Sequence, residues 1–147
     1  MAAQQKLINS ERKDRSIRLW GERGQLALET GHICVLSATA LATEVLKNLV
    51  LPGVGAFTIV DRSRVTERDL GNNFFESIGQ PRGSEVMRNL LELNSEVQGH
   101  FLDENPVDLI ETNPSSLLKF SCVVVTDLPD APLAKLAALL WAHKQQS

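Results

Sequence analysis

The chain has 147 residues, a formal net charge of −3, 43% hydrophobic residues and 22% charged residues. This length is typical of one domain with a substantial core, and the composition is that of an ordinary globular protein. The charge gives no indication of a nucleic-acid or membrane partner, because both bind surfaces rich in Lys and Arg.

Both cysteines lie inside apolar runs, Cys34 in ICVL and Cys122 in CVVV. Such cysteines are usually small buried core residues, and their spacing matches neither a metal site nor a disulfide framework. The chain does not open with a cationic segment followed by an apolar one, and no apolar run is long enough to cross a bilayer. We therefore expect no metal, and a reducing compartment, the cytosol or the nucleus.

The first 31 residues are expected to form a helical segment ahead of the sheet. Residues 1–10 are polar and are expected to be loose. A short helix is predicted near Glu11–Trp20, and a second over Arg23–Glu29, which Gly31 ends. The apolar anchors of this segment are Ile17, Leu19, Trp20, Leu26 and Leu28.

Residues 32–61 organise the rest of the chain. The apolar, β-branched run Ile33–Leu36 is typical of a buried strand. Ala42–Leu51 has apolar residues at helical spacing and ends at a Pro-Gly pair, and Ala56–Val60 is a second apolar run. Strand, helix and strand in such close succession form a βαβ crossover, which predicts a parallel sheet.

The turn after the first strand is where a nucleotide-binding unit carries G-x-G-x-x-G, whose glycines let the backbone approach phosphates at a helix N-terminus. Here residues 37–42 read SATALA, and all three glycine positions carry a Cβ. The architecture of a nucleotide site is present, but its phosphate cradle is filled. Asp61 ends the second strand, where an acidic residue meets a ribose in such folds. A polar strand end that leads into a turn explains Asp61 equally well.

After Asp61, residues 62–85 form a long polar connection with Phe74-Phe75 as its apolar anchor. Such a loop is either functional or a simple strand-to-helix excursion. A helix is predicted over Arg82–Leu93 and a third strand, near an edge, over Glu96–Leu102. The side chains of the helix expected to face the core are Val86, Leu90, Leu91 and Leu93.

Three more elements complete the chain: a short helix over Pro106–Thr112, a strongly apolar fourth strand over Phe120–Val125, and an Ala/Leu-rich helix over Pro132–Lys144. The last helix is expected to place Leu136, Leu139, Leu140 and Trp141 on one face. Such a helix normally leads into another strand, so we expect half of a doubly wound domain with an exposed sheet edge. The three histidines match no catalytic spacing and are expected to be surface or packing residues: His32, His100 and His143.

Several motifs together resemble ubiquitin-activating enzymes, which have the ThiF/MoeB-type adenylation fold. Residues 13–21, KDRSIRLWG, resemble the Y-D-R-Q-x-R-L-W-G motif of that family, and residues 44–55, EVLKNLVLPGVG, resemble its first crossover. NNFF at 72–75 and LELN at 91–94 continue the match. The resemblance implies an α/β fold with a Rossmann-like parallel sheet, of which only the N-terminal half is present. The expected division is a helical segment over 1–31 and a partial adenylation domain over 32–147.

Within the family, the glycine-free turn, LVLPGVG and GNNFF resemble most the regulatory, catalytically incomplete subunits of the heterodimeric enzymes that activate the modifier of the neddylation pathway. The equivalent subunits of the SUMO pathway are the alternative, and they usually keep more glycine in the turn. The resemblance implies two partners, the catalytic subunit and the ubiquitin-like modifier. It also implies that ATP and Mg²⁺ bind in the catalytic subunit, which carries the catalytic cysteine, and that this chain binds no cofactor.

Arg15 is the residue that the resemblance assigns to the partner's ATP phosphates. A guanidinium donates bidentate hydrogen bonds to phosphate and offsets the charge that develops during adenylation. The alternative is that Arg15 pairs with Asp14 or Glu11 on a solvated helix. Lys13 replaces the leading tyrosine of the motif, and Ser16 replaces its glutamine.

The positions that hold a triphosphate in active members are altered. Ser63 replaces the second of two aspartates after the second strand, and residues 79–82, GQPR, lack the first lysine of G-K-x-K. Asp69, Asn72 and Asn73 stand where active members have Asn, Arg and Gln. Losing glycines, an arginine and a lysine together leaves little to offset the charge of a triphosphate.

Three functions remain open from the sequence. The first is a regulatory, non-catalytic subunit that supplies Arg15 to a partner. The second is a stand-alone nucleotide-binding protein, which only Asp61 supports. The third is a truncated interaction fragment that competes with the full-length subunit.

Overall fold

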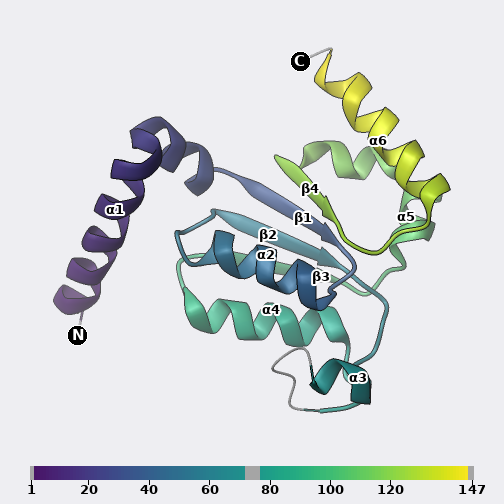
Figure 1. Cartoon of the computed structure of the whole chain (residues 1–147), viewed down its shortest axis with the longest axis horizontal. Helices are drawn as coiled ribbons and strands as arrows, with labels where there is room; N and C mark the ends of the chain where they lie inside the picture. The colour runs from purple at the N-terminus through teal and green to yellow at the C-terminus, as the bar shows by residue number, and fades with distance from the viewer. Residues whose placement is uncertain (1, 72–76, 146–147) are drawn as a thin grey trace.

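The computed structural model describes residues 2–71 and 77–145, with residues 2–12 described by their backbone alone. Four parallel strands form one sheet in the order β3-β2-β1-β4, as Figure 1 shows. The strands are β1 (His32–Leu36), β2 (Ala56–Val60), β3 (Gln98–Leu102) and β4 (Cys122–Val125). The predicted parallel sheet is confirmed, with the third strand at one edge and the fourth strand at the other.

Helices cover both faces of the sheet (Figure 1). On one face α2 (Ala40–Val50) and α4 (Arg82–Leu93) pack on alternate residues of β1 and β2, and this core includes Val35, Leu46, Phe57 and Leu90. On the other face lie α5 (Pro106–Thr112), the 3₁₀ helix η1 (Pro114–Lys119) and α6 (Asp130–Lys144), around Cys34, Leu36 and Ile110. Both β1 and β2 are therefore buried on both sides, which explains their continuous apolar runs.

The N-terminal helix α1 (Ala2–Glu29) differs from the prediction. Residues 1–10 were expected to be loose, but residues 2–10 have helical backbone, so this expectation is wrong for them. Gly21, with φ 74° and ψ 170°, interrupts the helix between the two predicted segments. Leu19 and Leu26 were predicted to be apolar anchors but are 77% and 62% exposed. Leu19 belongs to the first half of α1, which projects away from the sheet (Figure 1), whereas Leu26 follows the bend at Gly21.

Other expectations of burial were also wrong. Cys122 is exposed because β4 is an edge strand. On α6 only Leu136 is buried and Trp141 is 66% exposed, so this helix contacts the sheet along part of one face. Leu93, in the last turn of α4, is also exposed, whereas Val86 and Leu90 of the same helix are buried as predicted.

The connection from β2 to α4 contains the short helix α3 (Glu67–Leu70), which the sequence analysis did not predict. A capping box between Thr66 and Asp69 starts it. The predicted anchor Phe74-Phe75 lies outside the described residues. No helix within residues 2–71 and 77–145 is long and apolar enough to cross a membrane.

The loop before β2 depends on a glycine. A Cβ on Gly55 would lie 2.2 Å from the Glu29 carbonyl oxygen and 3.0 Å from that of Gly31. Because both contacts are with backbone, we expect Gly55→Ala to lower the free energy of unfolding by about 3 kcal/mol, measured by urea denaturation. Gly71→Ala is the control, since its nearest added contact is 3.9 Å away. Equal effects of the two substitutions would contradict this account of Gly55.

Candidate functional site

The turn between β1 and α2 keeps a backbone shape that glycine usually provides. Ser37 has φ 73°, which is the left-handed region, and it occupies the first glycine position of the nucleotide-binding pattern. Thr39 is the N-cap of α2 and accepts a hydrogen bond from the Ala42 amide at 3.2 Å. A helix N-terminus therefore points to the carboxyl end of β1, where parallel sheets bind their ligands.

The left-handed conformation of Ser37 is expected to lower the stability of the folded chain. This conformation costs a residue with a Cβ about 1–2 kcal/mol, whereas the greater chain entropy of glycine costs about 0.5–1 kcal/mol. We therefore expect Ser37→Gly to be more stable than Ser37→Ala by up to about 1 kcal/mol, a comparison in which both variants lose the hydroxyl that donates to the Asp127 carbonyl. Ala38→Gly, at a neighbouring buried position without a positive φ, should instead lower the free energy of unfolding by a similar amount. Thermal and urea denaturation measures these differences, and a Ser37→Gly protein less stable than Ser37→Ala would contradict the prediction.

The Asp61 carboxylate binds a backbone amide of the turn between β1 and α2. Its side chain is buried, with only 1% of the residue exposed. One oxygen accepts hydrogen bonds from the Ala38 amide at 2.9 Å and from the Arg82 Nε at 2.8 Å. The other oxygen accepts a hydrogen bond from the Ser63 amide at 2.7 Å. An incoming phosphate would have to compete with this carboxylate for the Ala38 N–H.

Arg82 stands at the second cationic position of the G-K-x-K pattern, and two carboxylates neutralise it. Besides Asp61, it pairs with Asp69 at 3.6 Å. Burial alone would raise the pKa of Asp69, but hydrogen bonds from Thr66 and the charge of Arg82 outweigh it and hold the pKa below its usual value. Arg82 is thus already paired inside the chain and would have to leave two carboxylates to bind a triphosphate.

A second contact closes the turn from the side of β4. The hydroxyls of Thr39 and Thr126 share a hydrogen bond at 2.6 Å, and the Ser37 hydroxyl donates to the Asp127 carbonyl at 3.3 Å. The sequence analysis gave Thr126 and Asp127 no role and missed this contact. The signal it offered was weak, since two hydroxyl residues at two strand ends are common in proteins.

Arg15 lies on α1, at the opposite end of the sheet from the turn. The chain enters β1 from α1, whereas the turn follows the carboxyl end of β1 (Figure 1). The strand has five residues, which at about 3.3 Å per residue separate its two ends by roughly 16 Å. The Arg15 side chain is exposed, and Asp14, one of its expected partners, pairs instead with Arg18 at 2.8 Å. The roles predicted for Arg15 and Asp61 stay predictions.

Two of the three histidines meet on the sheet face opposite α2 and α4. The ring centroids of His32 and His100 are 5.8 Å apart, and His32 Nε2 hydrogen-bonds with the Thr58 hydroxyl at 2.8 Å. Burial, aided by the charges of His100 and Lys119, lowers the pKa of His32. In the described part of the chain no three His, Cys, Asp or Glu side chains gather as a metal site would require.

These features define a class of protein. A parallel sheet in the order β3-β2-β1-β4 with a helix N-terminus after β1 is a Rossmann-like domain, a nucleotide-binding architecture whose turn here is occupied by its own side chains. The chain belongs to the ThiF family, which it matches over residues 12–146.

Relatives and solved structures agree with this assignment. The chain is 50% identical over 137 residues to the NEDD8-activating enzyme E1 regulatory subunit of Gallus gallus, covering 91% of the chain and 26% of the relative. The corresponding Drosophila melanogaster subunit is 42% identical over 135 residues, covering 90% and 26%. The chain thus spans about a quarter of the length of these relatives. The structure of E. coli tRNA N6-threonylcarbamoyladenosine dehydratase, TcdA, in complex with ATP matches with a TM-score of 0.76 at 20% identity, covering 91% of this chain and 56% of that chain, and it supports the fold alone.

Proposed function

We propose that this chain acts as the inactive adenylation half of the regulatory subunit of an enzyme that activates NEDD8, the modifier of the neddylation pathway. It binds the catalytic subunit and performs no adenylation of its own. The observation that carries the proposal is the buried Asp61 carboxylate, which holds both the turn amide of Ala38 and the Arg82 guanidinium. The named relatives supply the pathway.

The proposal places ATP and Mg²⁺ in the partner subunit and no cofactor in this chain. Adenylation builds negative charge on the phosphates, so the step benefits from a cation held beside them. Arg15 supplies that cation from outside the partner's own sheet. Its exposed side chain, on the helix that precedes β1 rather than beside the turn that follows it, supports action in trans.

The neddylation pathway is favoured over the SUMO pathway. Relatives from Gallus gallus, Xenopus laevis and Danio rerio, at 47–50% identity, are all named as regulatory subunits of the NEDD8-activating enzyme. The partners are then the catalytic subunit of that enzyme and the modifier. The cytosol or the nucleus is the compartment in which we expect the pair to work.

Co-purification with the catalytic subunit tests the proposal. We expect the 147-residue chain to be retained by the immobilised catalytic subunit and to support ATP-pyrophosphate exchange with the modifier. Failure to bind would rule out the regulatory role. Binding without support of exchange would favour the alternative of an interaction fragment that competes with the full-length subunit.

Calorimetric titration of the isolated chain with ATP tests the stand-alone alternative. We expect no binding below about 1 mM, because Arg82, the cation beside the turn among the described residues, is already paired with Asp61 and Asp69. Micromolar binding of ATP would favour an autonomous nucleotide-binding protein and contradict the proposal.

A further inference from the structure

We propose that Lys13 and Gln25 are positioning residues that lock the bend in α1 and so aim Arg15 away from its own sheet. The inference rests on the proposed function and deepens it. We call residues 2–20, the half of α1 before the bend, the arm. The arm carries Arg15, and its direction decides where that guanidinium can reach.

The backbone at the bend does not by itself hold the arm. Gly21 has φ 74° and ψ 170°, and an added Cβ there would meet no atom within 4 Å. The described residues therefore leave open space where a side chain at Gly21 would lie. Contacts on either side of the bend must determine the angle between the two halves of α1.

Side chains supply those contacts, and Gln25 is at their centre. Gln25 is buried, with 4% of the residue exposed. Its oxygen accepts the Trp20 indole N–H at 3.2 Å, and its amide nitrogen donates to Glu29 at 2.8 Å and to the Pro52 carbonyl at 3.3 Å. Gln25 thus joins the end of the arm, the second half of α1 and the loop that follows α2.

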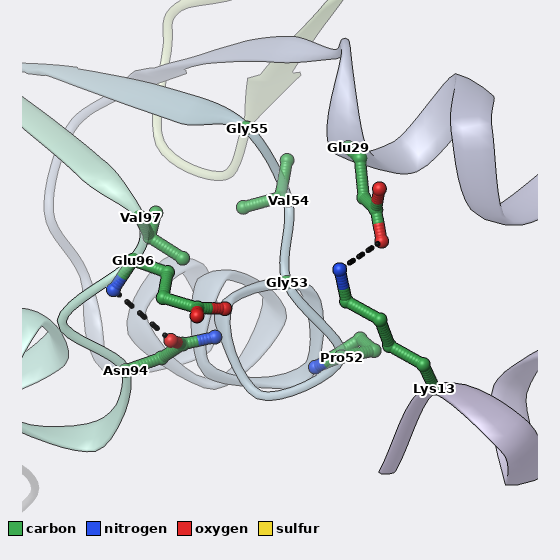
Figure 2. Close-up of a pocket in the computed structure, with 9 residues that line it drawn as sticks. All are labelled: Lys13, Glu29, Pro52, Gly53, Val54, Gly55, Asn94, Glu96 and Val97. Atoms are coloured by element: carbon green, nitrogen blue, oxygen red, sulfur yellow. Dashed lines mark hydrogen bonds and ion pairs between the residues drawn. The ribbon is translucent and has the colours of Figure 1, made fainter. Parts of the chain in front are cut away.

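Lys13 closes the connection from the arm. Its Nζ lies 3.2 Å from the Glu29 carboxylate, on the other side of the bend and sixteen positions later in the sequence. The pKa of Glu29 lies below its usual value, chiefly because Gln25 donates a hydrogen bond to the carboxylate. Burial raises this pKa, and the contact with Lys13 lowers it further. Figure 2 shows Lys13 and Glu29 facing one another beside Pro52, at the rim of a cavity of about 190 Å³.

Helix geometry converts this contact into a direction for Arg15. At 3.6 residues per turn, positions 13 and 15 lie about 200° apart around the helix axis. With Lys13 turned toward Glu29 and the body of the domain, Arg15 is turned outward, in agreement with its exposed side chain. The contact therefore presents Arg15 to a second protein rather than to this domain.

Lys13 also departs from the family motif, which has tyrosine at this position. A tyrosine would carry no positive charge toward Glu29, so the ion pair is a property of this chain. Lys13→Arg should preserve the contact because it keeps the charge and the reach, whereas Lys13→Ala removes it.

Distance measurements between spin labels test the positioning directly. The labels are placed on exposed residues of the arm and of α2, as Arg18→Cys and Asn48→Cys, in a Cys122→Ser background. Cys34 stays unlabelled, because it is buried and burial raises its pKa to about 12. We expect one narrow distance distribution for the otherwise unchanged chain and for Lys13→Arg, and broad ones for Lys13→Ala and Gln25→Ala. Unchanged distributions in both alanine variants would overturn the proposal whatever the chain binds.

Exchange assays with the catalytic subunit give the second reading. We expect Lys13→Ala to slow adenylate formation about 3-fold and Gln25→Ala about 10-fold, as loss of one exposed ion pair and of partly buried hydrogen bonds implies. Lys135→Ala is the matched control, since its side chain is 46% exposed against 48% for Lys13 and pairs with Glu111 at 2.7 Å on another surface. If Lys13 acts through Arg15, Lys13→Ala should have no further effect in an Arg15→Ala background. Additive losses in the double variant would overturn the positioning role. So would normal activity of the enzyme reconstituted with Gln25→Ala when the enzyme reconstituted with Arg15→Ala is impaired. Normal activity of the enzyme reconstituted with Arg15→Ala would instead count against the proposed function itself.

Discussion

Asp61→Ala is expected to lower the free energy of unfolding by about 3–5 kcal/mol, because it breaks a buried, hydrogen-bonded ion pair. The substitution leaves the Ala38 and Ser63 amides without their acceptor and removes the closer of the two carboxylates that neutralise Arg82. The loss should be visible as a lower urea midpoint with an unchanged slope.

The chain offers a matched control for this prediction. Asp103 also pairs with an arginine, Arg64, at 2.8 Å, but these side chains are 42% and 46% exposed, against 2% and 15% for Asp61 and Arg82. Asp103→Ala should therefore cost less than about 1 kcal/mol. If both aspartate variants lost similar stability, burial would not be the source of the Asp61 effect. The Asp61 carboxylate would then be free to serve a ligand, as the ribose hypothesis requires.

Arg15→Ala is expected to slow adenylate formation by the reconstituted pair about 10²- to 10³-fold, the usual cost of removing one preorganised donor to a charge that develops in the transition state. Affinity between the subunits should change little, because replacing one exposed side chain leaves the fold, and so the rest of the contact surface, intact. Pyrophosphate exchange measures the rate, and pull-down measures the affinity.

Two variants sharpen this test. Arg15→Lys keeps the charge but loses the planar fork that binds phosphate at two points, so part of the activity should return. Arg88→Ala removes an exposed arginine from α4, where it pairs with Glu85 at 2.8 Å, and should leave the rate unchanged. Equal rates for the Arg15→Ala pair and the unmodified pair would refute action in trans.

Predictions from local pattern were accurate where buried residues recur with a regular period. The strands at Ile33–Leu36 and Ala56–Val60 and the helix Arg82–Leu93 were predicted within one or two residues. Each has a period that a single face or a buried sheet imposes, and that period is a property of neighbouring residues. Errors gathered on α1 and α6, whose apolar residues are exposed at positions such as Leu19 and Trp141.

The candidate site was predicted only in part. The glycine-free turn was visible in the sequence, because the residues that would fill a phosphate cradle are adjacent in the chain. What holds the turn was not visible: Arg82 lies 21 residues from Asp61, and Thr126 lies 87 residues from Thr39. Nor did any pattern show that two separated histidines meet, since their rings come together only where β1, β2 and β3 align.

The sequence by itself determined the alternation of strand and helix, the parallel sheet and the loss of phosphate-binding residues, because each depends on residue type and local spacing. Only the tertiary structure decided which polar groups meet. Asp61 holds Arg82 because two loops converge at the carboxyl end of the sheet, and Lys13 reaches Glu29 because α1 bends at Gly21. Such pairs depend on the path of the chain through space, which local periodicity does not encode.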